Sequence, residues 1–329
     1  MARSPGTLFD TPMTADGWNL VCLIGPTASG KTALSLEIAQ HIPLRIISVD
    51  SAMVYRGMDI GTGKPSAEWL HRFPHEFVNL IDPSQPWSAG DFLQQLGPAI
   101  ARAKHANQIP ILVGGTMLYF YLLLQGIAPA PALSDALKEQ LRMRAQAEGT
   151  HSLHRQLSEL DPESAQRIGV NDYVRIERAL GVALQTGRTL SHFQRQQKPF
   201  LPPASNVLLL CIQKEREQLY LRIQRRFDQM VSDGLVDEVL QLKQRSDMEP
   251  ELPAMRAIGY RQVWKWLDGE GSFKSMEAQV LTASRILLKR QMNWLNRFQG
   301  LRNILTVEDA LTQISAFHQT VAQVPTSGQ

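Results

Sequence analysis

The stretch LIGPTASGKTALSLEIAQ, residues 23–40, decides the fold of this 329-residue chain. An apolar run ends at Ile24, small residues follow, and a helical pattern begins near Lys31. Residues 25–32, GPTASGKT, fit GxxxxGK[ST] without a mismatch, between a predicted strand and a predicted helix as that motif requires. We therefore predict a phosphate-binding loop, because the amides of such a loop converge on phosphate oxygens at a helix N-terminus.

Every residue of this loop is a candidate for binding a diphosphate: Gly25, Pro26, Thr27, Ala28, Ser29, Gly30, Lys31 and Thr32. Lys31 is expected to neutralise phosphate charge, and the hydroxyl of Thr32 is expected to ligate Mg²⁺. A glycine-rich turn without a ligand is the plain alternative, and the complete match to the pattern disfavours it. The loop does not reveal whether its ligand is a nucleoside triphosphate or another diphosphate.

The composition describes a folded protein without a strong charge bias. Hydrophobic residues make up 43% of the chain, and 34 Lys and Arg oppose 31 Asp and Glu for a net charge of +3. This net charge neither demands nor excludes a polyanionic partner, so the placement of the basic residues matters more. Cys22 and Cys211 lie in apolar, strand-like runs and are expected to be buried thiols of a reducing compartment.

No segment of the sequence is predicted to cross a membrane. The first 18 residues lack an apolar stretch behind a basic start, and no apolar run approaches the roughly 18 residues that span a bilayer. We therefore expect a cytoplasmic protein with no membrane partner and a flexible N-terminus at residues 1–18. Nothing in the sequence indicates an obligate dimer, so we expect a monomer.

Strand-like and helical patterns alternate up to about residue 125, which predicts a parallel sheet with crossover helices. The apolar runs that read as strands lie at residues 20–25, 44–50, 76–82, 110–115 and 207–213. Residues 134–197 contain only helical patterns, with start and stop signals at Ser134, Gly149, Asp161-Pro162 and Gly187.

The fold class predicted from these patterns is α/β. It has a P-loop, nucleotide-kinase-like parallel-sheet core that begins at residues 19–127. A helical insertion domain follows at residues 128–203, between two proline-rich connections. The core resumes at residues 204–329 and ends in C-terminal helices.

The ends of two further predicted strands do not show whether the ligand is a nucleoside triphosphate or another diphosphate. An NTPase usually offers a metal-binding Asp after an apolar strand, and Asp82 fits that position. Asn79 interrupts that strand, and Asp82-Pro83 is equally typical of a turn or helix entry, which is the interpretation we favour. Gly114 and Gly115 either allow close approach to a ligand or form a plain strand-to-helix turn.

Asp50 follows a buried apolar strand in IISVDSAMVYRGMDIGTGKP, residues 46–65. The carboxyl end of a parallel strand is the edge where α/β sheets bind ligands. A carboxylate there suits holding Mg²⁺ through water, or taking a proton from a nucleophile that attacks beside the diphosphate. The plain alternative is a side chain that caps a turn through Ser51.

Four blocks occur in an order and spacing that resemble the tRNA dimethylallyltransferase (tRNA isopentenyltransferase) family. They are GPTASGKT, SVDSAMVYRGMDIGTGKP, GGTMLYF and RAIGYRQVW. The resemblance extends from about Asn19 to Phe298. It implies transfer of a dimethylallyl group from dimethylallyl diphosphate to the exocyclic N6 amine of the adenosine just 3′ of the tRNA anticodon.

The resemblance also implies catalytic roles. Asp50 matches the family's catalytic aspartate and is expected to take the proton of the amine. Arg226, in LYLRIQRRFDQMV, matches a catalytic arginine and is expected to bind the diphosphate together with Lys31, although the sequence alone favours a solvated arginine there. Thr116 matches a position in the channel where donor and nucleotide meet.

The same resemblance implies that the insertion domain and three further segments contact tRNA. The expected tRNA-binding residues are Asp50, Ser51, Ala52, Met53, Thr116, Lys138, Val174, Arg175, Ile176, Glu177, Arg178, Arg256, Ala257, Ile258, Gly259, Tyr260 and Arg261. By residue type, Arg256 and Arg261 suit phosphate contact, and Tyr260 suits stacking on an unstacked loop base. The target adenine is expected to leave the anticodon-loop stack.

Basic residues are segregated along the chain. Residues 165–198 carry six Lys or Arg against two acids, and residues 278–302 carry five against none. Such segments are expected to bind phosphates of an anticodon stem-loop, with a strong salt dependence. A solvated helix face is the alternative for each.

Two departures from the family pattern limit what can be transferred. Tyr173-Val174 stand where Pro-Gln is expected, so one side-chain hydrogen bond to tRNA is lost. No Cys/His cluster follows the core, which favours a bacterial or organellar type.

Three other functions remain open. A P-loop kinase or ATPase would need Asp82 as a metal ligand. An adenylate isopentenyltransferase would modify free nucleotides, and it would have no use for the insertion and the basic C-terminal helices. A non-catalytic RNA-binding module would have no use for Lys31 or Asp50.

Overall fold

A computed structural model describes residues 17–322. The predicted flexible N-terminus, residues 1–18, lies outside the described residues except for its last two. Of these, Trp18 is buried, and its carbonyl accepts a hydrogen bond from the amide of Asn206 at 2.7 Å. The chain forms two compact units, a helical unit at Leu122–Leu201 and a core unit made of the residues before and after it.

The core unit is built on one sheet of parallel strands in the order β3-β2-β4-β1-β5-β6. The strands are β1 (Asn19–Ile24), β2 (Leu44–Val49), β3 (His75–Glu76), β4 (Ile109–Gly114), β5 (Asn206–Ile212) and β6 (Arg302–Ile304). The predicted parallel sheet is therefore confirmed. Its central strand, β1, is buried at every position after Asn19, which explains its continuous apolar run.

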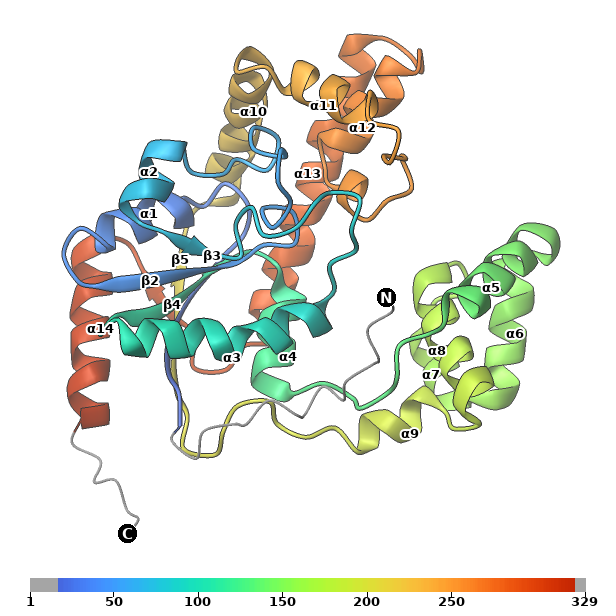
Figure 1. Ribbon diagram of the computed structural model, residues 1–329, viewed down its shortest axis with the longest axis horizontal. Coiled ribbons are helices and arrows are strands. Elements are labelled where there is room, and N and C mark those ends of the chain that lie inside the picture. The colour runs from blue at the N-terminus through green and yellow to red at the C-terminus, as the bar shows by residue number, and fades with distance from the viewer. Residues whose placement is uncertain (1–16, 323–329) are drawn as a thin grey trace. The chain divides into compact units, whose positions relative to one another are not determined.

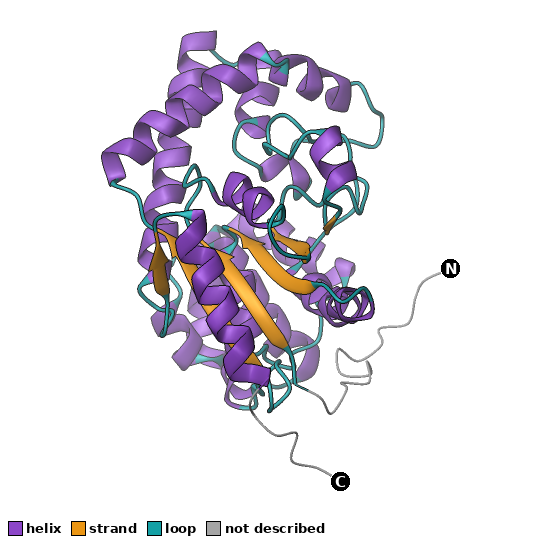
Figure 2. Cartoon of the chain, turned by 90° about the vertical axis from the view of Figure 1, so that its left-hand side faces the viewer, coloured by secondary structure: helices purple, strands orange, loops and turns teal. Residues whose placement is uncertain are grey.

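Helices cover both faces of this sheet, as Figure 2 shows. The helices of the core unit are α1 (Lys31–Ile38), α2 (Ala67–Arg72), α3 (Ala89–His105), α10 (Arg216–Ser232), α11 (Leu235–Lys243), α12 (Tyr260–Leu267), α13 (Phe273–Leu295) and α14 (Val307–Ala322), and α4 (Met117–Gln125) begins in the core unit and ends in the helical unit. The apolar side chains of α1 and α14 share one cluster with β1, β2, β4, β5 and β6. No described helix is both long and apolar enough to cross a bilayer.

One predicted strand is much shorter than expected, and one strand was not predicted. Only His75–Glu76 of the segment around residues 76–82 is a strand, because Phe77 and Asn79 take positive φ angles of 64° and 54° that break the extended backbone. The short edge strand β6 was missed, because three residues carry too little periodicity to show in the sequence.

The helical unit contains α5 (Asp135–Glu148), α6 (Thr150–Leu160), α7 (Pro162–Arg167), α8 (Tyr173–Thr186) and α9 (Leu190–Arg195), drawn in green and yellow in Figure 1. The predicted signals delimit these helices. Ser134 caps α5 by accepting a hydrogen bond from Leu137 N, Asp161 caps α7 with Pro162 in its first turn, and Gly187 ends α8 at a φ of 68°. The connections entering and leaving the unit pair at Ile127 and Lys198.

Candidate active site

Three predicted site segments meet at one edge of the sheet because their strands end level. Ile24 at the end of β1 and Val49 at the end of β2 both pair with Gly114 at the end of β4. The phosphate loop, the Asp50 segment and the Gly115-Thr116 segment therefore leave the sheet side by side. The strand pattern predicted that these segments share an edge, and the register places their first residues level.

The end of β4 approaches β2 so closely that Gly114 has no room for a side chain. A Cβ at Gly114 would lie 2.0 Å from the carbonyl oxygen of Val49. Thr116 then closes the junction, because its amide donates to Val49 O at 3.2 Å and its hydroxyl accepts from Ser51 N at 3.1 Å. The close approach at Gly114 is thus to the neighbouring strand rather than to a ligand.

Side chains that donate hydrogen bonds to the carbonyl oxygens of the phosphate loop stabilise its turn. Ala28 and Gly30 take positive φ angles of 62° and 100°, which curl the chain into the N-terminus of α1. Arg222 of α10 donates to Ala28 O at 3.1 Å and to Ser29 O at 3.2 Å. The first amides of α1 have no helical acceptor, so the loop presents donors to an anion.

Lys31 lies at the bottom of this loop, and its ammonium donates to Pro26 O at 2.7 Å and to Ser29 Oγ at 3.4 Å. Burial lowers the pKa of Lys31 to about 8, with Asp50 opposing that shift and Arg226 adding to it. The side chain is still mostly charged at neutral pH. An anion bound in the loop would compete for this ammonium and stabilise its charged form.

Asp50 has one oxygen engaged and one available. Its Oδ1 accepts hydrogen bonds from Ala52 N at 2.8 Å and Met53 N at 3.2 Å, the turn-capping geometry that the sequence left open. Its Oδ2 makes no hydrogen bond with any residue the structure describes. The backbone therefore orients the carboxylate, and its second oxygen stays available for a proton or a metal ion.

Arg226 of α10 is partly buried and lies against the loop that follows the Asp50 segment. Its Nη2 donates to Thr62 O at 2.8 Å, and a Cβ on Gly63 would lie 2.2 Å from that nitrogen. Burial lowers the pKa of Arg226, and the charge of Asp50 opposes this shift. Lys31, Asp50 and Arg226, which the sequence placed in three separate segments, are thus brought within electrostatic reach of one another.

Glu238 of α11 shapes the loop that carries Thr62 and Gly63. Its carboxylate accepts hydrogen bonds from Asp59 N at 2.7 Å, Ile60 N at 2.8 Å and Gly61 N at 3.1 Å. Successive amides that converge on one carboxylate fix a tight turn. Because Arg226 bonds to this loop, Glu238 indirectly sets the position of the guanidinium.

Tyr260, predicted to stack on an RNA base, is fully buried and donates its hydroxyl hydrogen to Glu238 at 2.5 Å. The ring packs against Gly61, where a Cβ would lie 2.5 Å from Cε2 of Tyr260. No ring face is left for a base, so this placement does not fit the stacking role. The flanking Arg256 and Arg261 are exposed, as phosphate contact would require.

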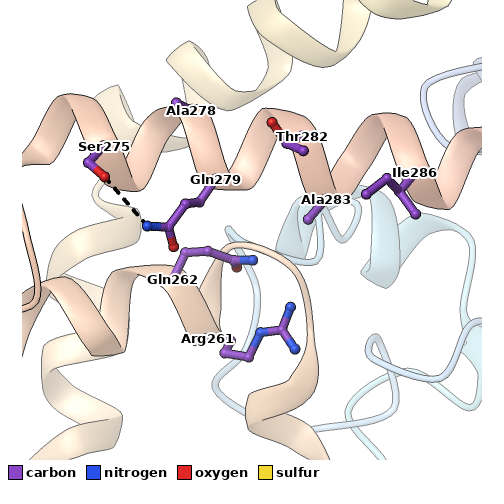
Figure 3. Close-up of a pocket in the computed structure, with 8 residues that line it drawn as sticks. All are labelled: Arg261, Gln262, Ser275, Ala278, Gln279, Thr282, Ala283 and Ile286. Atoms are coloured by element: carbon purple, nitrogen blue, oxygen red, sulfur yellow. Dashed lines mark hydrogen bonds between the residues drawn. The ribbon is translucent and has the colours of Figure 1, made fainter. Parts of the chain in front are cut away.

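Arg261 also lines a shallow pocket of about 400 Å³ between α12 and α13, shown in Figure 3. The pocket is lined by Arg261, Gln262, Ser275, Ala278, Gln279, Thr282, Ala283 and Ile286. Small and polar side chains dominate it. Within it, Gln279 donates to Ser275 on the same helix at 3.5 Å.

The predicted tRNA-binding residues of the helical unit differ in exposure. Val174 is 60% exposed and Arg175 is exposed next to Asp172, whereas Ile176 is fully buried in the core of the unit and offers no side chain to a partner. Arg178 donates to the carbonyls of Pro131 and Ala130 at 2.6 and 3.0 Å, and its burial lowers its pKa. The backbone contacts of Arg178 indicate a structural role.

Two other residues of that set are held by their own helices. Lys138 pairs with Asp135 one turn earlier at 2.9 Å. Glu177 accepts a hydrogen bond at 2.7 Å from the hydroxyl of Tyr173, the residue that stands where proline was expected.

Asp82 is a turn residue. Its Oδ1 accepts from Ser84 N at 3.0 Å and from Arg245 Nη2 at 2.7 Å. Arg245 and these turn bonds lower the pKa of Asp82 to about 2. The favoured interpretation of the sequence, a structural turn, therefore fits this carboxylate better than an NTPase metal site does.

Sequence reasoning missed three residues that shape the site: Arg222, Glu238 and Gln291. Gln291 of α13 is 6% exposed and bonds to both the phosphate loop and the end of β4. The helical spacing of Met276, Val280 and Leu288 could have revealed Gln291, because it lies on the same buried face of α13. A buried glutamine without hydrogen-bond partners would be costly, so partners for its amide could have been expected.

Comparison with known proteins places this site in a family. The family described as IPP transferase matches residues 53–298. The chain is 44% identical over 279 residues to a tRNA dimethylallyltransferase of Coxiella burnetii, covering 85% of this chain and 90% of that protein. It is 45% identical over 289 residues to a tRNA dimethylallyltransferase of Alkalilimnicola ehrlichii, covering 88% and 90%.

Solved structures give the same result. The crystal structure of a full-length tRNA isopentenylpyrophosphate transferase from Bacillus halodurans is similar with a TM-score of 0.68 and 31% identity, over 93% of this chain and 98% of that one. A eukaryotic dimethylallyltransferase acting on tRNA shares the fold with a TM-score of 0.76 at 24% identity, over 95% and 81%. The chain belongs to the IPP transferase family.

Proposed function

We propose that this protein transfers a dimethylallyl group from dimethylallyl diphosphate to N6 of the adenosine 3′ of the anticodon in tRNA. The products are N6-isopentenyladenosine in tRNA and diphosphate. The observation that carries this proposal is the site itself. A phosphate loop with a partly buried lysine lies beside Asp50, whose backbone-oriented carboxylate keeps Oδ2 available.

The phosphate loop, Lys31 and Arg226 are assigned to the leaving group. As the carbon–oxygen bond of the donor breaks, its electrons move to the bridging oxygen of the diphosphate. Lys31 and Arg226 are both partly buried, so water screens their charges less than it would screen exposed side chains. The amides at the N-terminus of α1 add donors to the same anion.

Asp50 is assigned to the proton of the amine. The N6 lone pair is delocalised into the adenine ring, so the amine is a poor nucleophile until its proton leaves. N6 forms the new bond to the allylic carbon while Oδ2 of Asp50 takes the proton. Oδ1 keeps its bonds to Ala52 N and Met53 N, so the base does not need to reorient.

The site residues fit Mg²⁺ as the cofactor. Among the described residues there is no cluster of three or more His, Cys, Asp or Glu side chains, which argues against a metal held by protein alone. Mg²⁺ instead takes one or two protein oxygens and completes its shell with phosphate and water. The Thr32 hydroxyl is the group proposed to hold it, which leaves Asp50 Oδ2 available as the base, and Mg²⁺ would neutralise diphosphate charge there.

For tRNA we propose the exposed groups among the predicted residues. In the core unit these are Ser51, Arg256 and Arg261, together with the half-buried Thr116 and the basic stretch 278–302. In the helical unit, residues 128–203 are proposed to bind the anticodon stem, with Val174 and Arg175 at the surface.

The proposal includes a cytoplasmic monomer. All the groups assigned to the reaction come from one chain. The two free thiols, Cys22 and Cys211, are buried, as suits a reducing compartment where tRNA is modified.

A transfer assay tests this function. The protein is incubated with Mg²⁺, labelled dimethylallyl diphosphate and either unmodified tRNA or AMP. Label in tRNA with little in AMP is the expected result. Label in AMP alone would make the protein an adenylate isopentenyltransferase, and ATP hydrolysis without transfer would make it a kinase or ATPase.

A further inference from the structure

Gln291 is a buried polar side chain that links two loops of the site from a distant helix. Its Oε1 accepts a hydrogen bond from Thr27 N in the phosphate loop at 2.8 Å, and its Nε2 donates to Gly115 O after β4 at 2.8 Å. One partner is an N–H and the other a carbonyl, so only one orientation of the amide satisfies both. The side chain is 6% exposed, so water does not substitute for either partner.

Gly115 is shaped for this contact. A Cβ at Gly115 would lie 2.7 Å from Gln291 Nε2 and 3.3 Å from Gly25 O. The constraint is one of space, and the nearest atom is the end of the glutamine side chain. Gly115 therefore lets the amide of Gln291 reach between the two loops.

The contact with Thr27 also limits where an anion can bind. Pro26 has no N–H, the amide of Thr27 is taken by Gln291, and the amide of Ser29 bonds to Pro26 O at 3.3 Å. The donors that remain lie toward the N-terminus of α1, near Lys31. Gln291 thus confines the diphosphate to one end of the loop.

The contact between Gln291 and Gly115 connects the phosphate loop to the segment that carries Asp50, the proposed general base. Gly115 precedes Thr116, whose hydroxyl accepts from Ser51 N at 3.1 Å, and Ser51 follows Asp50. We propose that Gln291 is a positioning residue: it fixes the loop that holds the leaving group against the segment that carries Asp50. This inference rests on the proposed function, and it concerns alignment of donor and base rather than binding of either substrate.

Gln291→Glu separates the two bonds. An ionised carboxylate accepts from Thr27 N but cannot donate to Gly115 O, whereas a protonated carboxyl can do both. A buried carboxyl titrates above its ordinary pKa of about 4.3. Activity relative to the wild type should therefore recover as the pH falls from about 7.5 to about 5.5.

Gln185 of α8, at an exposed position, supplies a control for the chemical change alone. Its Oε1 accepts from Ser134 N at 2.9 Å and its Nε2 donates to Ala132 O at 2.9 Å, the same pair of bonds in the helical unit. Gln185→Glu makes the same chemical change, without a bond to the phosphate loop.

The experiment measures single-turnover transfer of label from dimethylallyl diphosphate to tRNA, and pyrophosphate binding with Mg²⁺ by calorimetry. For Gln291→Glu at pH 7.5 we expect a rate loss of about 10- to 100-fold, a typical effect of misalignment. Pyrophosphate affinity should fall at pH 7.5, because the ionised carboxylate repels the anion, and should return to within about threefold of the wild type near pH 5.5, so the transfer rate is measured at saturating donor. Gln185→Glu should keep the wild-type pyrophosphate affinity at both pH values.

Three results would overturn the inference: a transfer rate equal to that of the wild type, a rate loss that does not change with pH, or an equal loss of pyrophosphate affinity in Gln185→Glu. If Gln291→Glu does not fold, Gly115→Ala displaces the same amide from the opposite side. A full transfer rate in Gly115→Ala would overturn the inference as well, and the rate loss with retained pyrophosphate binding would support it. Absence of transfer by the wild type would instead contradict the proposed function.

Discussion

At the scale of single residues, the proposed reaction depends on how the two oxygens of Asp50 are used. Oδ1 is bonded to Ala52 N and Met53 N, so the same side chain caps a turn and presents Oδ2. The capping role and the base role, which looked like alternatives in the sequence, are therefore compatible. One oxygen orients the carboxylate for the work of the other.

Replacing Asp50 by Asn should separate the two roles. An amide oxygen can still accept from Ala52 N, so the turn should persist, but the amide cannot take a proton. We expect the single-turnover rate of transfer to fall about 10²- to 10⁴-fold. The free energy of unfolding should change by no more than about 1 kcal/mol, the worth of a hydrogen bond. Transfer at the wild-type rate would show that another group is the base.

The pKa of Lys31, about 8, predicts how diphosphate binding depends on pH. Lys31 is charged below that pH and loses its charge as the pH rises through it, whereas an exposed lysine stays charged to about pH 10. Pyrophosphate affinity should therefore decline above about pH 8. Asp50 raises the pKa of Lys31, so Asp50→Asn should move this decline to lower pH.

Calorimetry of pyrophosphate binding to the wild type and to Asp50→Asn at each pH tests this prediction. The titration of pyrophosphate itself is common to the two and cancels in their ratio. If the decline occurs at the same pH in both proteins, Asp50 and Lys31 are not coupled as described.

At the scale of elements, the loop of residues 59–64 positions Arg226. Glu238 holds three of its amides, and Gly63 leaves the room that the guanidinium occupies. This loop belongs to the block GMDIGTGKP, so its glycines are explained by space for protein side chains. None of its hydrogen bonds goes to a described residue of the phosphate loop, and we propose that it affects the diphosphate through Arg226.

Gly63→Ala and Gly57→Ala test this arrangement as a matched pair. Gly63 and Gly57 have φ angles of 65° and 70°, so both alanines should cost about 1–2 kcal/mol of backbone strain. A Cβ at Gly63 would lie 2.2 Å from Arg226 Nη2, whereas a Cβ at Gly57 would meet nothing within 4 Å. Only Gly63→Ala should weaken pyrophosphate binding, by about tenfold, the worth of one charge-assisted hydrogen bond.

Denaturant unfolding and calorimetry measure the two effects. Equal losses of stability with unequal losses of pyrophosphate affinity are expected. Equal affinities in the two variants would remove Arg226 from the diphosphate site.

At the scale of the whole molecule, the two basic stretches differ in how their charges are used. In residues 165–198, Arg167 and Arg195 both pair with Glu163, and Arg175 pairs with Asp172. In residues 278–302, no basic side chain forms an ion pair with a residue that the structure describes. The second stretch therefore offers more unneutralised charge to RNA phosphates.

Salt dependence of tRNA binding should show this difference. Replacing exposed Lys289 and Arg290 together by Gln should reduce the slope of log K against log salt by about one to two, because each phosphate contact contributes about 0.7–0.9. Arg167 and Arg195 replaced together by Gln should change it less, since these side chains already neutralise Glu163. Filter binding over a range of salt concentrations measures both slopes, and a larger change for the second pair would reverse the assignment.

Local patterns in the sequence predicted several features of this protein. The turn at residues 25–32, the end of β2 at Asp50, the caps at Ser134 and Asp161 and the helices that follow Ser134 were all predicted, and phosphate binding by that turn stays a prediction. Each depends on a motif or a periodicity within a few neighbouring residues. The resemblance to a known family added Arg226 and Thr116, which no local pattern would have singled out.

Contacts between residues distant in the sequence could be seen only in the tertiary structure. Gln291 bonds to Thr27 across 264 positions, and Glu238 bonds to Tyr260 and to a loop near residue 60. The same packing buries Tyr260, which its residue type had assigned to an RNA base. Periodicity shows that a side chain faces the interior, but the partner it meets there depends on how the sheet order and helix packing bring remote segments together.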